Sequence, residues 1–157
     1  MKFPDPEIRL TRGEAETREF ARTLAAACGP GAVWALSGDL GAGKTRFVQG
    51  LCDGLGVRAA VCSPTFAIAN EYGGDGGSPR LVHLDLYRLS GPDELESIGW
   101  DDYIDSGDTL AVEWPERAGR FLPSRRTARV SIERVSDGDP ETRRISFAPP
   151  TQDNTVE

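Results

Sequence analysis

The chain has 157 residues and a mass of 17.0 kDa, and its 38% hydrophobic and 27% charged residues are typical of one globular domain. Its formal net charge of −7 disfavours a protein that grips DNA, RNA or an anionic membrane by itself, because such binding depends on excess positive charge. One histidine and three cysteines without a Cys-x-x-Cys pair exclude a multi-histidine metal site and disfavour a zinc or disulfide scaffold, and the lack of an apolar signal core or apolar span predicts a cytoplasmic protein that does not cross a membrane.

The first predicted elements are a helix and a buried strand. Thr11 and Glu14 have the spacing of a capping box, so we expect the helix to open in this region, and the glycines from Gly29 onward to stop it. The short apolar run 32–36 is typical of a strand buried on both faces.

A glycine-rich loop follows this strand over residues 38–43. A second helix is expected to begin near Lys44 and to stop at Gly56, since glycine is common just beyond a helix end. Residues 61–65 are expected to form a loop, and 66–72 a strand.

The rest of the chain is predicted to be mainly strands. We expect, in order, a flexible tip over 73–79, a strand over 81–86, a short helix over 92–98, a strand over 109–113, and two strands over 128–135 and 144–147. The last two are expected to pair antiparallel across a polar turn. Alternating strands and helices predict an α/β fold, a mixed, mainly parallel sheet flanked by helices in a single domain.

The glycine-rich loop carries a complete phosphate-binding pattern. The pattern G-x-x-x-x-G-K-[ST] is matched by Gly38-Asp39-Leu40-Gly41-Ala42-Gly43-Lys44-Thr45, called the phosphate loop below. It lies between a predicted strand and a predicted helix, the context that this motif requires. Its glycines let backbone N–H groups surround a phosphate, Lys44 reaches the β- and γ-phosphates, and the Thr45 hydroxyl is a ligand for Mg²⁺. The loop therefore predicts a P-loop nucleotide site, and GTP is disfavoured because no Asn-Lys-x-Asp motif occurs.

Two predicted strands end in an acidic residue, Asp85 and Glu113. A P-loop protein needs a carboxylate at the end of a neighbouring strand to hold Mg²⁺ or its water shell. In an open α/β sheet both residues would emerge at the edge where ligands bind. The alternative is a solvated strand end, but the phosphate loop favours the functional interpretation.

Several other positions have two interpretations each. The Ser63-Pro64-Thr65 segment is either a switch that senses the γ-phosphate or metal, or a proline-containing turn. Trp114 shields the site or stacks on a base, or belongs to the core. We expect His83 to be structural. Arg125-Arg126 is either a lid over phosphates or, as we favour, a solvated pair.

Four motifs in order give the chain a resemblance to a known family. They are the phosphate loop, Ser63-Pro64-Thr65-Phe66, His83-Leu84-Asp85-Leu86-Tyr87-Arg88-Leu89 and Glu113-Trp114-Pro115-Glu116. With this combination, over about residues 10 to 122, the chain resembles the TsaE (YjeE) family. These are bacterial P-loop ATPases needed to make threonylcarbamoyladenosine at position 37 of tRNA.

The resemblance implies a role for each matched position. Residues Gly38 to Lys44 would bind the ATP phosphates, Thr45 the Mg²⁺, and Ser63, Pro64 and Thr65 would form a switch. Lys44, Asp85 and Glu113 would be catalytic, with Asp85 in a Walker B-like role and Glu113 supporting Mg²⁺. Trp114 would lie beside the nucleotide, Thr11 near the adenine, and Arg144 close to the nucleotide.

The resemblance also implies a function and partners. It implies a weak Mg²⁺-dependent ATPase stimulated by the TsaB and TsaD proteins. tRNA would be met only through that complex. We expect a P-loop ATPase domain over 1–148 and, from its place at the chain end, a disordered tail over 149–157. Two other functions stay open: a small-molecule kinase, which needs an acceptor pocket and an arginine-bearing lid, and a nucleotide-gated binding module without turnover.

Overall fold

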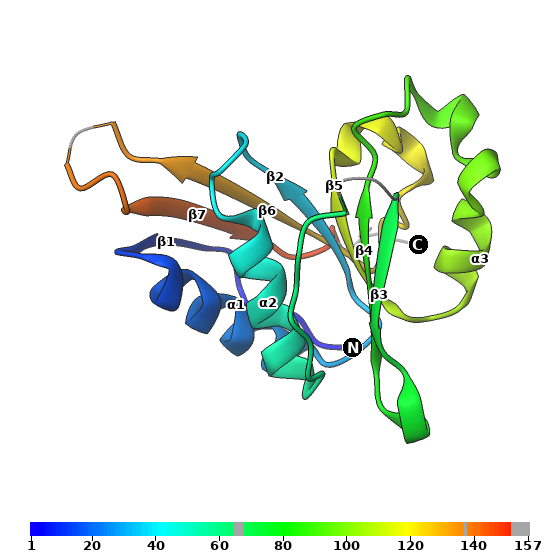
Figure 1. The fold of residues 1–157 in the computed structure, drawn as a ribbon, viewed down its shortest axis with the longest axis horizontal. Coiled ribbons are helices and arrows are strands. Elements are labelled where there is room, and N and C mark those ends of the chain that lie inside the picture. The colour runs from blue at the N-terminus through cyan, green and yellow to red at the C-terminus, as the bar shows by residue number, and fades with distance from the viewer. Residues whose placement is uncertain (65–67, 137, 152–157) are drawn as a thin grey trace, which may run out of the picture.

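The computed structural model describes residues 1–64, 68–136 and 138–151. Within them, seven strands form one sheet in the order β1-β7-β6-β2-β5-β4-β3 (Figure 1). The strands and α-helices are β1 (Glu7–Thr11), α1 (Glu14–Cys28), β2 (Val33–Ser37), α2 (Lys44–Leu55), β3 (Ala69–Gly73), β4 (Arg80–Asp85), α3 (Trp100–Asp105), β5 (Thr109–Glu113), β6 (Thr127–Arg134) and β7 (Arg143–Ala148). Short 3₁₀ turns are η1 (Asp75–Gly77), η2 (Pro92–Glu94), η3 (Glu96–Ile98), η4 (Pro115–Arg117) and η5 (Gly119–Phe121).

The centre of the sheet is parallel. β6, β2, β5 and β4 pair parallel with one another, while β3, β7 and β1 are added antiparallel at the two edges. Every residue of β5 is buried, as in a strand covered on both faces. The predicted α/β class, with a mixed sheet whose parallel strands form its centre, is therefore confirmed, as is the antiparallel pairing of the last two strands.

Helices cover the two faces of the sheet with separate apolar clusters. On one face, α1 and α2 pack over β2, β6 and β7, where the buried Trp34 ring lies 6.2 Å from Phe47 and 6.0 Å from Phe147 between ring centroids. On the other face, Val33 and Trp100 belong to the cluster that packs α3 and the short turns onto β2, β4 and β5. No helix of the described part of the chain is long and apolar enough to span a membrane.

Two glycines let α2 lie close to α1. A Cβ atom on Gly50 would lie 2.1 Å from the Arg18 carbonyl oxygen and 2.6 Å from the Ala21 Cβ. A Cβ atom on Gly54 would lie 2.4 Å from the Arg22 carbonyl oxygen. Since the last two residues of the phosphate loop, Lys44 and Thr45, are the first two of α2, this close packing fixes where the loop ends.

We expect Gly50→Ala to lower the free energy of unfolding, because the added methyl group meets the backbone of α1. The clash costs about 1–3 kcal/mol, and the gain of at most about 1 kcal/mol that alanine brings to a helix interior offsets only part of it. Urea denaturation measures the change. The control is Gly91→Ala, because Gly91 has extended backbone and no atom lies within 4 Å of the place that its new methyl group would occupy. Equal stability of the two variants would contradict the close packing.

The N-terminal region differs from the sequence expectation. Thr11 does not open a helix: it ends β1, an edge strand that the sequence did not predict, and pairs with Arg143 of β7. Its buried hydroxyl lies 2.7 Å from the Thr17 hydroxyl, and α1 begins at Glu14 behind Gly13 with no side-chain cap. Pairing with a distant strand therefore outweighs the local capping signal.

The region after β4 also differs. The helix predicted over 92–98 is two 3₁₀ turns, and α3 follows them, separated by Gly99 with a left-handed φ of 75°. The strand predicted over 66–72 corresponds to β3, although its first residues lie outside the described part. The predicted domain boundary at residue 148 stays a prediction, since 152–157 also lie outside.

Candidate functional site

A cavity of about 840 Å³ opens where the carboxyl ends of β2, β4 and β5 meet. Most of the predicted site residues line it: the phosphate loop except Ala42, together with Ser63, Asp85, Glu113 and Trp114. The parallel strands bring them together, because their carboxyl ends lie at one edge of the sheet. Segments distant in sequence therefore form one site.

The phosphate loop connects β2 to α2 by a backbone path that needs glycine. Gly38 has a φ of 156°, and a Cβ atom there would lie 2.7 Å from the Ile132 carbonyl oxygen. Gly43, with a φ of 116°, is the residue before α2. The N-terminus of α2 therefore points its unpaired N–H groups and positive field toward the cavity, which favours an anion there.

Lys44 and Glu113 form the charged centre of the site. The Lys44 Nζ atom donates to the Gly38 carbonyl oxygen at 2.7 Å and lies 3.4 Å from Oε1 of Glu113. The other carboxylate oxygen, Oε2, lies 2.8 Å from Nε2 of His83, which is fully buried. Asp85 lies directly opposite Glu113 in the β4–β5 register. His83 was expected to be structural, but it contacts a predicted catalytic residue.

The surroundings of Glu113 keep its carboxylate ionised. Burial alone would raise its pKa, but the hydrogen bond with His83 and the positive charges of His83 and Lys44 together lower the pKa below its ordinary value. Among the described residues, His83 Nδ1 has no hydrogen-bond partner. The other ring nitrogen, Nε2, is the atom that bonds to Glu113. At neutral pH the site therefore presents a carboxylate beside Lys44.

Because the pKa of Glu113 is lowered on folding, its carboxylate stabilises the fold above the ordinary glutamate pKa of about 4.3, and this contribution is lost as pH falls through the folded value. We expect the free energy of unfolding to fall less steeply below about pH 5 in Glu113→Gln than in the wild type. Urea denaturation at several pH values measures this. The exposed Glu133→Gln is the control and should keep the wild-type slope; parallel curves for all three would contradict the lowered pKa.

The predicted switch segment touches the predicted metal ligand. The Ser63 hydroxyl lies 2.8 Å from the Thr45 hydroxyl, and Pro64 is buried. Thr65 lies outside the described residues. A hydroxyl pair of this kind couples the segment after α2 to the first turn of α2, where a metal ligand is expected.

Trp114 lines the cavity and is not a core residue. It is 36% exposed and has a left-handed φ of 57°, the one positive φ of a non-glycine residue in the described chain. Its ring lies 5.0 Å from that of Tyr87, which also lines the cavity and which sequence reasoning missed. Strained backbone of this kind clusters at functional sites. The sequence signal for Tyr87 is its position two residues after Asp85, close to the predicted site.

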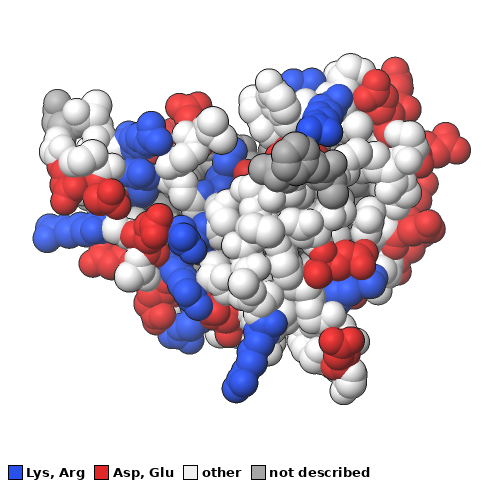
Figure 2. All heavy atoms as spheres, viewed as in Figure 1, with Lys and Arg blue, Asp and Glu red and all other residues white. Residues whose placement is uncertain are grey.

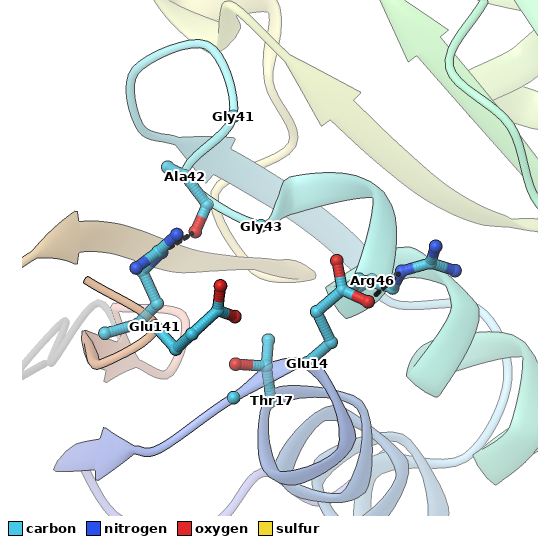
Figure 3. A pocket seen from close by; sticks show the side chains of 9 residues that line it. Glu14, Thr17, Gly41, Ala42, Gly43, Arg46 and Glu141 are labelled. Atoms are coloured by element: carbon cyan, nitrogen blue, oxygen red, sulfur yellow. Dashed lines mark hydrogen bonds and ion pairs between the residues drawn. The ribbon is translucent and has the colours of Figure 1, made fainter. Parts of the chain in front are cut away.

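A smaller pocket of about 110 Å³ lies on the α1 side of the phosphate loop (Figure 3). Glu14, Thr17 and Glu141 line it, and Glu14 pairs with Arg46 at 3.1 Å. Thr11 lines neither space but touches Thr17, so its predicted place near adenine stays a prediction.

Two arginine positions singled out in the sequence lie away from the large cavity. Arg144 is exposed on β7 and does not line the cavity, whereas Arg143 donates to the Ala42 carbonyl oxygen at 2.8 Å. Of the predicted solvated pair, Arg125 is exposed as expected, whereas Arg126 is half-buried and is not a lid over the cavity. Its guanidinium donates to the backbone carbonyls of Gly31, Ile104 and Asp108. It therefore braces the amino ends of β2 and β5, at the opposite edge of the sheet.

Comparison with known proteins places this site in a family. The family model described as "Threonylcarbamoyl adenosine biosynthesis protein TsaE" matches residues 11–145. A relative named tRNA threonylcarbamoyladenosine biosynthesis protein TsaE from Bacillus subtilis (strain 168) is 43% identical over 126 residues, which are 80% of this chain and 77% of the relative. A protein of the same name from Streptomyces coelicolor is 45% identical over 131 residues, 82% of this chain and 87% of the relative.

A solved structure agrees with the fold. The crystal structure of YdiB from Bacillus subtilis matches with a TM-score of 0.72 at 33% identity, covering 96% of this chain and 90% of that chain. The matched span 11–145 contains the phosphate loop, both strand-end carboxylates and Trp114. On sequence and on structure together, the chain belongs to the TsaE family.

Proposed function

We propose that the chain binds ATP and Mg²⁺ in the large cavity and hydrolyses ATP slowly, as an accessory protein in the formation of threonylcarbamoyladenosine at position 37 of tRNA. The observation that carries this proposal is the meeting of the phosphate loop with Asp85 and Glu113 at one edge of the sheet. The relatives' name, tRNA threonylcarbamoyladenosine biosynthesis protein, supports the pathway.

The residues of the cavity fit both ligands. A Cβ atom at Gly38 would collide with the Ile132 carbonyl of β6, so glycine lets the loop lie close against that strand. On the cavity side, Lys44 and the N-terminus of α2 favour a phosphate. The Thr45 hydroxyl and the carboxylates of Asp85 and Glu113 are oxygen donors, which Mg²⁺ prefers. Bound Mg²⁺ would neutralise phosphate charge, while Lys44 would hold the β- and γ-phosphates and Trp114 would flank the nucleotide.

Intrinsic turnover is expected to be slow. Arg46, the arginine among the described lining residues, is paired with Glu14, which leaves no free arginine at the phosphates. An arginine supplied by a partner is worth about 10³–10⁵ in rate. We therefore propose that the TsaB and TsaD proteins stimulate hydrolysis within a complex.

Surface charge supports tRNA contact only through such a complex. On the face shown in Figure 2, basic and acidic side chains alternate, and acidic ones gather over α3. The described residues of this face offer no continuous basic patch for the phosphates of an RNA, and the formal net charge of the whole chain is −7. Proteins are therefore the proposed direct partners.

The test is ATP hydrolysis by the purified chain alone, with TsaB and TsaD, and with a panel of hydroxyl metabolites. We expect slow turnover alone and clear stimulation by the two proteins. A stoichiometric phosphorylated metabolite would instead show a kinase, an alternative that no observation favours since Arg126 is engaged elsewhere. Nucleotide binding without turnover in every mixture would show a binding module.

We expect Thr45→Ala to weaken ATP binding in Mg²⁺ while leaving ATP binding in EDTA nearly unchanged, because the backbone of the loop remains. Titration of a fluorescent ATP analogue under both conditions measures the two affinities. The exposed Thr23→Ala on α1 is the control, since Thr23 bonds only to its own helix. An equal loss of affinity in EDTA and in Mg²⁺ would remove Thr45 as a metal ligand.

A further inference from the structure

Backbone amides and side chains both donate hydrogen bonds to the carbonyl oxygens of the phosphate loop. The Ala42 N–H donates to the Asp39 carbonyl at 2.9 Å, and the Phe47 N–H donates to the Gly43 carbonyl at 3.0 Å. The Gly38 carbonyl accepts from Lys44. The carbonyls of Leu40 and Ala42 accept from side chains that lie outside the loop.

These two donors are arginines from the last two strands. Arg143 donates from Nε to the Ala42 carbonyl at 2.8 Å, a bond drawn as the dashed line at Ala42 in Figure 3. Arg134 donates from Nη2 to the Leu40 carbonyl at 3.4 Å. The same Nη2 atom would lie 2.7 Å from a Cβ atom on Gly41, so the guanidinium rests against the loop backbone.

The geometry of the peptide bond gives these contacts a consequence for the loop amides. In a planar trans peptide the C=O and N–H bonds point in opposite directions. A donor that holds the Leu40 carbonyl outward therefore turns the Gly41 amide the other way, and a donor on the Ala42 carbonyl does the same for the Gly43 amide. Amides turned in this way are the groups that a phosphate-binding loop needs.

The placement of the two arginines has a cost that the loop contacts offset. Arg134 and Arg143 lie directly opposite each other in the β6–β7 register, and like charges in that position are destabilising. Within the described residues, neither has a carboxylate within ion-pair distance. Arg143 instead also donates to the carbonyls of Pro140 and Thr142, which fixes its guanidinium in its own turn. Two like charges kept directly opposite each other, at a cost in stability, are expected where the residues have a function.

We propose that Arg134 and Arg143 are positioning residues that hold the phosphate loop in its phosphate-binding shape from behind. This role rests on the proposed nucleotide site and gives the β6–β7 pair a part in it. Arg143 lines the small pocket on the α1 side of the loop, but neither arginine lines the large cavity, so neither would contact a nucleotide bound in the large cavity. Both act through the loop carbonyls, and their positive charge polarises the same peptides toward a bound anion.

The experiment compares Arg143→Met and Arg134→Met with Arg129→Met. Arg129 is the matched control, because it lies on β6 with Arg134, is exposed, and has no bond to the loop. Amide hydrogen exchange is measured in the free protein over residues 38–47 and over α1, and ADP affinity is measured in EDTA. We expect Arg143→Met to speed exchange in the loop alone and to weaken ADP binding about tenfold, with about threefold for Arg134→Met.

Three outcomes would decide against the proposal. Unchanged exchange in the loop, or faster exchange spread equally over α1, would overturn it, and so would faster loop exchange with unchanged ADP affinity. If Arg143→Met does not fold, Arg143→Lys is measured in its place. We expect an intermediate effect, because the ammonium group keeps the charge and can still donate but lacks the forked guanidinium. If the wild type does not bind ADP, the proposed function fails, while loop exchange still decides the bracing role.

Discussion

Lys44→Ala is expected to weaken ATP binding by roughly ten- to a hundredfold, since a hydrogen bond to a charged group contributes about 1.5–3 kcal/mol. Lys44 lines the cavity, and its Nζ atom lies 2.7 Å from the Gly38 carbonyl oxygen at the start of the phosphate loop. No other lysine or free arginine among the described residues lines the cavity, so no neighbouring cation replaces it. Titration of a fluorescent ATP analogue measures the loss.

The control for this variant has to separate binding from folding. Lys44 also faces Glu113 at 3.4 Å, and its removal leaves that buried carboxylate with His83 as its remaining partner. Unfolding is therefore measured beside binding, and Lys2→Ala, which removes the other lysine from an exposed position, should change neither. Wild-type affinity in a folded Lys44→Ala protein would mean that the loop is not a phosphate site.

Asp85→Asn and Glu113→Gln are expected to lower ATP turnover sharply, on the order of a hundredfold, while ATP binding survives. Both changes keep the size of the side chain and remove its charge. In the proposed site the loop and Lys44 would hold the phosphates, whereas placement of the metal and activation of water would depend on the two carboxylates. In Glu113→Gln, Lys44 also loses its ion pair, so binding of the anionic nucleotide without Mg²⁺ should tighten.

The measurements for these variants are single-turnover hydrolysis with TsaB and TsaD, ATP titration in EDTA, and mass spectrometry of tRNA nucleosides from cells that rely on each variant. Stable protein with lost tRNA threonylcarbamoylation is the expected cellular result. The controls are Asp105→Asn and Glu133→Gln, which change exposed carboxylates away from the cavity. Full modification with both Asp85→Asn and Glu113→Gln would place these carboxylates outside the mechanism.

The parts of the site that could be predicted from the sequence depend on local pattern. The phosphate loop is contiguous, and Asp85 and Glu113 each end an apolar strand. The edge rule for parallel strands is sufficient to bring them together, and the β4–β5 register places them opposite each other. A phosphate-binding role for the β2–α2 connection can therefore be predicted from the contiguous motif alone.

The parts that could not be predicted depend on contacts between distant residues. Arg143 reaches Ala42 across 101 positions, and no spacing rule distinguishes it from its neighbour Arg144. Thr11 has a capping-box partner at Glu14, so local pattern favours a helix where pairing with β7 makes a strand. His83 reads as the middle of an apolar strand, although its position two residues before Asp85 put it on the same face of β4.

The pairing of β1 sets an order for synthesis of the protein. In the described sheet its one neighbour is β7, and Glu7 pairs with Phe147, 140 positions later. The N-terminus leaves the ribosome first, so β1 cannot pair in the sheet until β7, near the end of the chain, has been synthesised. Arg143 enters with the same strand. In a nascent chain, the phosphate loop is therefore synthesised long before Arg143, the residue of β7 that bonds to it. A stalled or truncated product lacks both β7 and this hydrogen bond to the loop.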